Sequence, residues 1–180
     1  ITGGRKGYKA ALFEGGIGVP FIARWPGTIA AGKVDKSSLL SAVDLLPTFC
    51  EIAGVALPVG YSPDGVSQLA TLLGTPSPSR DKPLFWKMSG AWPIKKGKPH
   101  HWVSYAIVHQ NWKLVSNRDS SYVELYDIRT DFLETTDLKK QESAVAAQLL
   151  KTLDAWKATL PAKPTGNVFS AERSAATQEE

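Results

Sequence analysis

The sequence contains very little cysteine and histidine and no long apolar run. Cys50 is the only cysteine in the 180 residues, so the chain cannot form an intrachain disulfide. No apolar stretch approaches the ~20 residues that a membrane-spanning helix needs. Of the three histidines, His100 and His101 are adjacent and would point to opposite sides of a strand, so they do not easily share one metal ion. The sequence opens with Ile1 and without a signal-peptide pattern, and we therefore expect a fragment or processed piece of a longer protein.

The chain also lacks a large excess of charge of either sign. The formal net charge is +4 and the isoelectric point is near 9.1, which favours a slightly basic globular protein over a nucleic-acid-binding one. With 43% hydrophobic and 21% charged residues, the composition fits one ordinary domain, or one domain and a smaller second one.

The most informative stretch runs from Gly3 to Gly27. It begins as a glycine-rich basic loop, passes Glu14-Gly15-Gly16, and enters the apolar run Val19 to Trp25, which predicts a buried strand. Glycine pairs let the backbone approach a ligand closely. Within the loop, Lys9 is a candidate anion ligand. Arg5 and Lys6 are interpreted as exposed surface charges, and Glu14 as a structural carboxylate that accepts N–H groups or pairs with a base.

The remainder predicts two units and a tail. In residues 1–80 we expect a helix over 37–53, with Asp44 as N-cap, Pro47 in its first turn and Gly54 as its stop, and a short helix over 67–73. The Pro/Ser-rich segment 75–82 is the predicted boundary. In residues 81–162 we expect about four short antiparallel strands (84–88, 102–109, 112–116 and 123–128) and a helix over 141–160, followed by a flexible tail over 163–180.

Several motifs, in this order and spacing, resemble the type I sulfatases of the alkaline phosphatase superfamily, which include arylsulfatases and N-acetylgalactosamine-6-sulfatases. The resemblance covers about residues 3–160. Gly18 departs from it, because relatives usually carry Arg there. The matching residues are Lys9, Glu14-Gly15-Gly16, Val19-Pro20, Trp25-Pro26-Gly27, Asp44-Leu45-Leu46-Pro47-Thr48, Asp64-Gly65, Leu72-Leu73-Gly74, Glu124-Leu125-Tyr126-Asp127, Asp131, Glu134 and Asp137-Leu138.

The resemblance implies a fold and a chemistry. Residues 1–80 would complete the edge of a large α/β, alkaline phosphatase-like domain, and residues 81–162 would form a small α+β domain with a four-stranded antiparallel sheet and a long C-terminal helix. The parent enzyme would hydrolyse sulfate esters with formylglycine and Ca²⁺, and Lys9 would bind the sulfate oxygens. The nucleophile and the Ca²⁺ ligands would lie in a missing N-terminal part, so we expect this chain alone to be inactive and to contain no metal site.

Two sites resemble the family's formylglycine motif without fitting it. Cys50 is followed by neither Pro nor Arg and falls on the apolar face of the predicted helix, so it is interpreted as a core residue. The sequence Ser77-Pro78-Ser79-Arg80 would place Pro76 at the nucleophile position, and proline has no oxidisable group.

The basic loop 89–101 offers a second candidate site. His100, His101 and Trp102 are candidates for a substrate subsite that binds an anionic sugar or aryl group, although an ordinary surface loop is the favoured interpretation of the histidines. By resemblance the partners are a sulfated sugar or aryl sulfate and the missing N-terminal domain, with neither nucleic acid nor membrane, and the compartment is periplasmic, secreted or lysosomal. Two alternatives remain: a phosphatase or phosphonate hydrolase of the same superfamily, and a non-catalytic scaffold or glycan-binding module.

Overall fold

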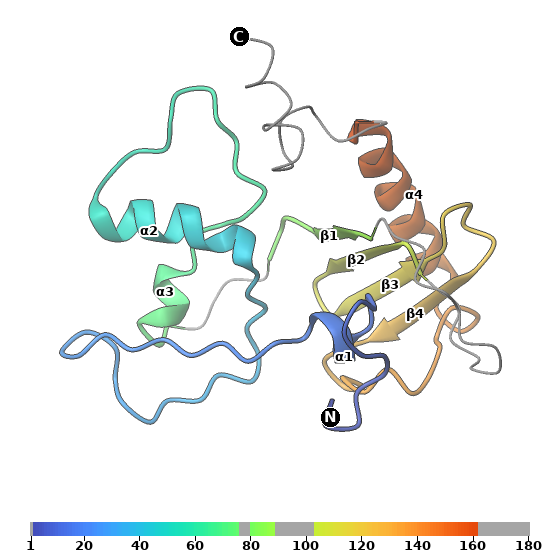
Figure 1. Ribbon diagram of the computed structural model, residues 1–180, viewed down its shortest axis with the longest axis horizontal. Coiled ribbons are helices and arrows are strands. Elements are labelled where there is room, and N and C mark those ends of the chain that lie inside the picture. Colours follow the sequence, from blue (N-terminus) through green and yellow to red (C-terminus); the bar gives the residue numbers. More distant parts are fainter. Residues whose placement is uncertain (1, 76–79, 89–102, 162–180) are drawn as a thin grey trace, which may run out of the picture.

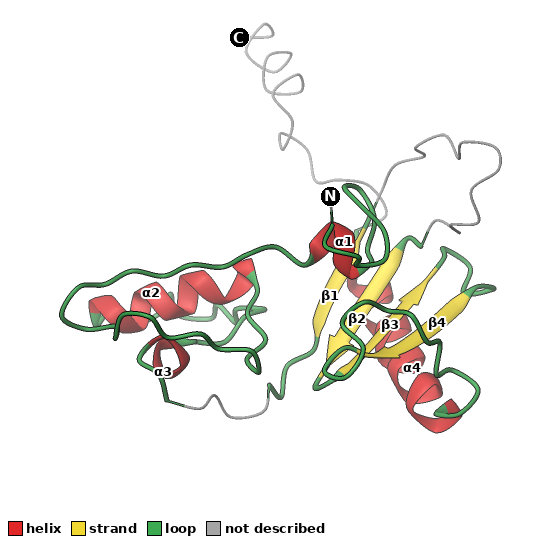
Figure 2. Ribbon diagram, turned by 90° about the horizontal axis from the view of Figure 1, so that it is seen from below, coloured by secondary structure: helices red, strands yellow, loops and turns green. Residues whose placement is uncertain are grey.

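The computed structural model describes residues 2–75, 80–88 and 103–161. Two packed regions, joined by extended segments, are visible in both views of the chain (Figures 1 and 2). One holds the helices α2 and α3, and the other holds the sheet, the helix α4 and the N-terminal segment. No helix in the described ranges is long and apolar enough to cross a membrane.

The sheet is an antiparallel meander in which each strand pairs with the next along the chain. Its strands, in spatial order, are β1 (Leu84–Lys87), β2 (Tyr105–His109), β3 (Trp112–Ser116) and β4 (Val123–Asp127). This confirms the predicted four-stranded sheet. The register places Lys113 of β3 between Val108 of β2 and Tyr126 of β4. Residues that lie directly opposite each other on neighbouring strands have their side chains on the same face, so these three side chains share one face.

The helix α4 (Ser143–Thr159) covers the other face, as Figure 2 shows. Leu149 and Leu153 recur at helical spacing and pack on Ile107 of β2, Leu114 of β3 and Leu125 of β4. At the edge of this core, the rings of Phe85 and Trp156 stack with their centroids 4.8 Å apart. The predicted helix over 141–160 is therefore confirmed, with its ends two and one residues shorter.

The face that carries Lys113 is covered by the start of the chain. Ala11, Leu12 and Phe13 are buried in a cluster with Ala106, Val115 and Tyr126 of the strands, and the short helix α1 (Glu14–Ile17) follows them. Residues from the beginning and from the second half of the sequence thus form one layered unit. The sequence analysis did not foresee this arrangement.

The strand predicted at Val19 to Trp25 does not form within this chain. The segment runs without strand pairing, and Val19, Phe21 and Ile22 are 76%, 52% and 90% exposed. The physical reason is that a strand needs a neighbour for its N–H and C=O groups, and no strand within the described ranges lies beside this segment. Val19, Phe21, Ile22 and Trp25 therefore face solvent.

The helical region is smaller than predicted. The 3₁₀ turn η1 (Ala42–Asp44) leads into α2 (Leu45–Ala53), and α3 is Leu69–Leu72. Gly54 ends α2 with φ of +65°, as expected of a C-terminal glycine. Asp44 precedes α2, but its side chain accepts the N–H groups of Ser41 and Val66 and pairs with Arg80 at 2.8 Å.

The predicted apolar face of α2 is not a buried face within this chain. Leu46 and Phe49 are largely exposed, and Cys50 is half-buried, whereas Pro47 and Thr48 are buried against the segment that leads to α3. The periodicity correctly indicated a helix, but the surface that would cover its apolar side is absent from the described residues.

Candidate functional site

The loop of residues 6–14, called the lysine loop below, carries Lys9 at its tip. Tyr8 and Ala11 close a tight turn around it, with the N–H of Ala11 donating to the carbonyl of Tyr8 at 2.9 Å. Ala10 has φ of +68°, a conformation that costs a residue with a side chain roughly 1–2 kcal/mol. The Lys9 side chain is exposed at this turn, and the turn therefore presents a cation to solvent.

Gly15 and Gly16 let the lysine loop pack directly on α1. A Cβ on Gly16 would lie 2.1 Å from the carbonyl oxygen of Ala11 and 2.7 Å from that of Tyr8. A Cβ on Gly15 would lie 2.5 Å from the carbonyl oxygen of Lys6, which accepts the Gly15 N–H at 2.7 Å. Both glycines of the Glu-Gly-Gly motif are thus required by close backbone contact with the lysine loop: Gly15 with its start and Gly16 with the turn that carries Lys9.

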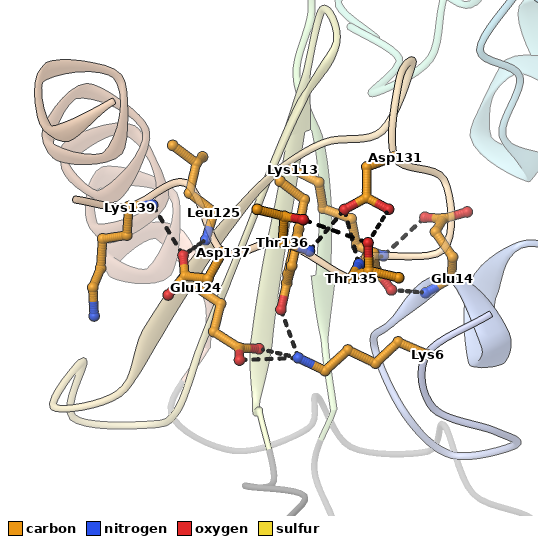
Figure 3. Close-up of polar contacts among 12 residues, drawn as sticks. Lys6, Glu14, Lys113, Glu124, Leu125, Asp131, Thr135, Thr136, Asp137 and Lys139 are labelled. Carbon is orange, nitrogen blue, oxygen red and sulfur yellow. Dashed lines mark hydrogen bonds and ion pairs between the residues drawn. The ribbon is translucent and has the colours of Figure 1, made fainter. Parts of the chain in front are cut away.

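Lys6 attaches the start of the lysine loop to β4. Its ammonium donates to both carboxylate oxygens of Glu124 at 2.9 and 2.8 Å (Figure 3). It also donates to the Tyr126 hydroxyl at 2.6 Å. It also lies 4.4 Å from the centroid of the Phe13 ring. Burial alone would raise the pKa of Glu124, but hydrogen bonds from Lys6 and from two tyrosines outweigh it and lower the pKa.

Lys113 attaches the end of the lysine loop to β3. Its side chain is fully buried, and the ammonium lies 2.8 Å from Glu14 Oε1 and 2.8 Å from Glu134 Oε1. The other oxygen of Glu134 accepts the backbone N–H of Glu14 at 2.7 Å. Burial raises the pKa of Glu134, with the Glu14 carboxylate acting in the same direction and the Lys113 charge opposing both.

The turn of residues 131–137 contains Glu134, the buried partner of Lys113. Asp131 accepts the N–H groups of Thr135 and Thr136 at 2.8 and 2.9 Å and so closes the turn. Asp137 accepts the N–H of Leu125 at 3.0 Å, at the outer edge of β4 (Figure 3). The three acidic residues of this turn therefore make different contacts: Asp131 closes the turn, Glu134 binds the lysine loop and Asp137 binds β4. Together they form the base on which the lysine loop rests.

Some of the sequence predictions for these residues agree with the structure and others do not. Glu14 pairs with a base, Lys113, as its structural interpretation stated. The prediction that Lys6 is a free surface charge is wrong, because the Glu124 carboxylate and the Phe13 and Tyr126 rings surround its ammonium. Arg5 is half-exposed and donates to the carbonyl of Gly18 at 2.8 Å. His100, His101 and Trp102 lie outside the described residues.

Lys113 and Glu134 are the residues that the sequence analysis missed. Lys113 stands in the otherwise apolar run Lys113-Leu114-Val115 at a position whose neighbours on the same face are buried. A lysine in the middle of a core strand is a signal for a buried ion pair, because an unpaired buried charge is very costly. Glu134 is the natural partner only once the fold is known.

Within the lysine loop, the exposed ammonium of Lys9 is the charged group that an anion can reach. No group of three or more His, Cys, Asp or Glu side chains within them is placed to hold a metal ion. The chemistry that this arrangement supports is electrostatic: a loop of fixed shape that presents Lys9 to a negatively charged ligand.

Comparison with known proteins shows the family to which the chain belongs. Residues 5–159 match the family described as N-sulphoglucosamine sulphohydrolase, C-terminal, and the chain belongs to this sulfatase family. A sulfatase of Formosa agariphila is 33% identical over an alignment of 161 residues, and the match covers 82% of this chain and 28% of the relative. Further relatives include arylsulfatase A of cattle and an N-acetylgalactosamine-6-O-sulfatase of Bacteroides thetaiotaomicron.

Solved structures share the fold. A Bacteroides thetaiotaomicron protein from a study of glycosaminoglycan metabolism (BT33336S-sulf) aligns with a TM-score of 0.65 at 24% identity, over 87% of this chain and 32% of its own. BT4656, solved with its substrate D-glucosamine-2-N,6-O-disulfate, aligns with a TM-score of 0.52 at 27% identity, over 79% of this chain and 29% of its own. The chain thus spans about a third or less of the length of these proteins.

Proposed function

We propose that this chain is the C-terminal part of an enzyme that hydrolyses sulfate esters, and that Lys9 binds the sulfate group of the substrate. The family match over residues 5–159 carries this proposal. The geometry of the lysine loop supports it, because the motif that resembles the sulfatases holds an exposed Lys9 on a backbone fixed at both ends.

The charge of the substrate explains why a lysine suits this task. A sulfate monoester spreads one negative charge over its non-bridging oxygens, and the bridging oxygen gains charge as the S–O bond breaks. The Lys9 ammonium has three donors and can follow that charge. One charge-assisted hydrogen bond contributes about 1.5–3 kcal/mol, and the contribution to rate grows where the contact is stronger in the transition state than in the ground state.

Formylglycine and Ca²⁺, the groups typical of the family, would have to come from other parts of the parent protein. Cys50 is half-buried on α2 and lacks the family's sequence context, and the described residues hold no candidate metal cluster. We therefore assign no step to either group here. We expect the 180-residue chain alone to leave an aryl sulfate intact.

A sulfated sugar is the substrate class that we propose. BT4656 was solved with a sulfated glucosamine as its substrate, and several relatives are named for sulfated sugars. In this proposal the loop 89–102, with His100, His101 and Trp102, contributes to the wall that contacts the sugar. A ring-stacking tryptophan and cationic residues suit an anionic sugar.

Replacing Lys9 tests the proposal directly. In the parent enzyme, Lys9→Ala should lower kcat/KM for an aryl sulfate on the order of 10²-fold without lowering the melting temperature, because the exposed ammonium has no part in packing. Lys33→Ala, which removes another exposed loop lysine, is the matched control and should have no effect. A change below threefold for Lys9→Ala would contradict the proposed role.

A further inference from the structure

The two ends of the lysine loop are attached to two consecutive residues, Leu133 and Glu134. At the start of the loop, the N–H of Lys6 donates to the carbonyl of Leu133 at 3.2 Å. At its end, the N–H of Glu14 donates to the carboxylate of Glu134 at 2.7 Å. The base of the loop is thus closed by a point on the 131–137 turn that lies about 120 residues away along the chain.

Contacts of both its side chain and its backbone fix Glu134 in place. Its side chain is fully buried, and Lys113 binds both it and Glu14, so the two carboxylates are fixed relative to each other. Its backbone has φ of +56°, and its N–H donates to the carbonyl of Asp131 at 3.0 Å. Strained, over-determined backbone of this kind is found where a group must be held in one place.

We propose that Glu134 is a positioning residue for Lys9: through the N–H of Glu14 and the shared Lys113, it sets the height of the lysine loop above the sheet. This proposal rests on the proposed function of Lys9. Misplacement of a charged group by about 1 Å can cost 10²-fold in rate. Glu134 would therefore affect catalysis without touching the substrate.

A double-mutant cycle separates positioning from plain stability. In the parent enzyme, Glu134→Gln should lower kcat/KM for an aryl sulfate about tenfold when Lys9 is present. In the Lys9→Ala background the same change should cost less than twofold, because the group that Glu134 positions has gone. An equal loss in both backgrounds would overturn the proposal and leave Glu134 a structural residue.

Two further variants keep the test decisive. Asp44→Asn removes a carboxylate from another buried ion pair, and its effect on kcat/KM should be equal in both backgrounds. If Glu134→Gln does not fold, the combined change Glu134→Gln, Lys113→Met and Glu14→Gln replaces all three charges of the buried cluster, which proteins often tolerate, and can enter the same cycle.

Amide exchange distinguishes failure of this inference from failure of the proposed function. Glu134→Gln should speed exchange of the N–H groups of Ala11 and Gly15 at least tenfold, whether or not Lys9 binds sulfate. If Lys9→Ala leaves the activity intact, the proposed function fails, while faster exchange would still show that Glu134 positions the loop. Unchanged exchange would overturn the positioning role in either case.

Discussion

The ammonium of Lys113 lies 2.8 Å from the carboxylate of Glu134, and neither side chain has any exposed surface. One strand of the sheet is joined in this way to the turn that follows the next strand. Glu14 shares the same ammonium, so three segments of the chain meet at one charge.

Removing Lys113 should therefore be strongly destabilising. Lys113→Ala leaves Glu134 buried without its cation, and we expect a loss of about 3–5 kcal/mol in the free energy of unfolding. Urea denaturation of the 180-residue chain measures it. Lys157→Ala, which breaks the more exposed pair with Asp154, is the control and should cost about 1 kcal/mol or less. Similar costs for both changes would contradict the buried arrangement.

The two carboxylates that face the N-terminal segment should give opposite pH dependences. Because the folded-state pKa of Glu134 is raised above 4.5, its folded carboxyl holds a proton that the unfolded chain has lost, and stability falls as the pH rises from about 4.5 through the raised pKa. The pKa of Glu124 is lowered, so its stabilising contribution is present above 4.5 and is lost as the pH falls through the lowered pKa.

Denaturation of the chain over a range of pH, with each glutamate replaced by glutamine, measures these contributions. The stability of the wild type relative to Glu134→Gln should decrease with rising pH above 4.5. Relative to Glu124→Gln it should increase with rising pH below 4.5. Slopes of the same sign in both comparisons would refute the assignment.

The contact between Gly16 and the turn of the lysine loop predicts that Gly16 cannot be replaced by alanine without moving the turn. In Gly16→Ala, the new Cβ meets the carbonyl of Ala11, so α1 and the turn must separate, and the Ala11 N–H should exchange faster. Gly32→Ala is the control: nothing lies within 4 Å of the added Cβ, and its φ of +72° costs only about 1–2 kcal/mol. Unaltered exchange at Ala11 in Gly16→Ala would disprove the close packing.

The exposed apolar residues of 19–25 should make the chain associate with itself. Contiguous exposed apolar surface favours contact with other molecules. We expect light scattering to show oligomers at micromolar concentration and Ile22→Asp to reduce them. Val59→Asp, a charge at another fully exposed position, should have no such effect. A monomeric wild type would show that this surface is tolerated in water.

The sequence predicted the local elements well and their long-range partners poorly. The strand Trp112 to Ser116 was predicted with its observed bounds, because its pattern and the preceding turn are both local signals. The apolar run Val19 to Trp25 looked like a strand as well, but pairing depends on a neighbour that no local pattern specifies. Lys9 was identified through the family motif, whereas the contacts of Lys6 and Lys113 span 118 and 99 residues and required the fold.

The separation of these partners along the chain also means that they are synthesised at different times. A ribosome adds about 5–20 residues per second, so roughly 6 to 24 s pass between the synthesis of Lys6 and that of its partner 118 residues later. During this interval the buried Leu12 and Phe13 have no sheet to cover. The lysine loop is thus made well before the strands on which it packs, and a nascent chain stalled before β4 would expose the segment that carries Lys9 to chaperones and proteases.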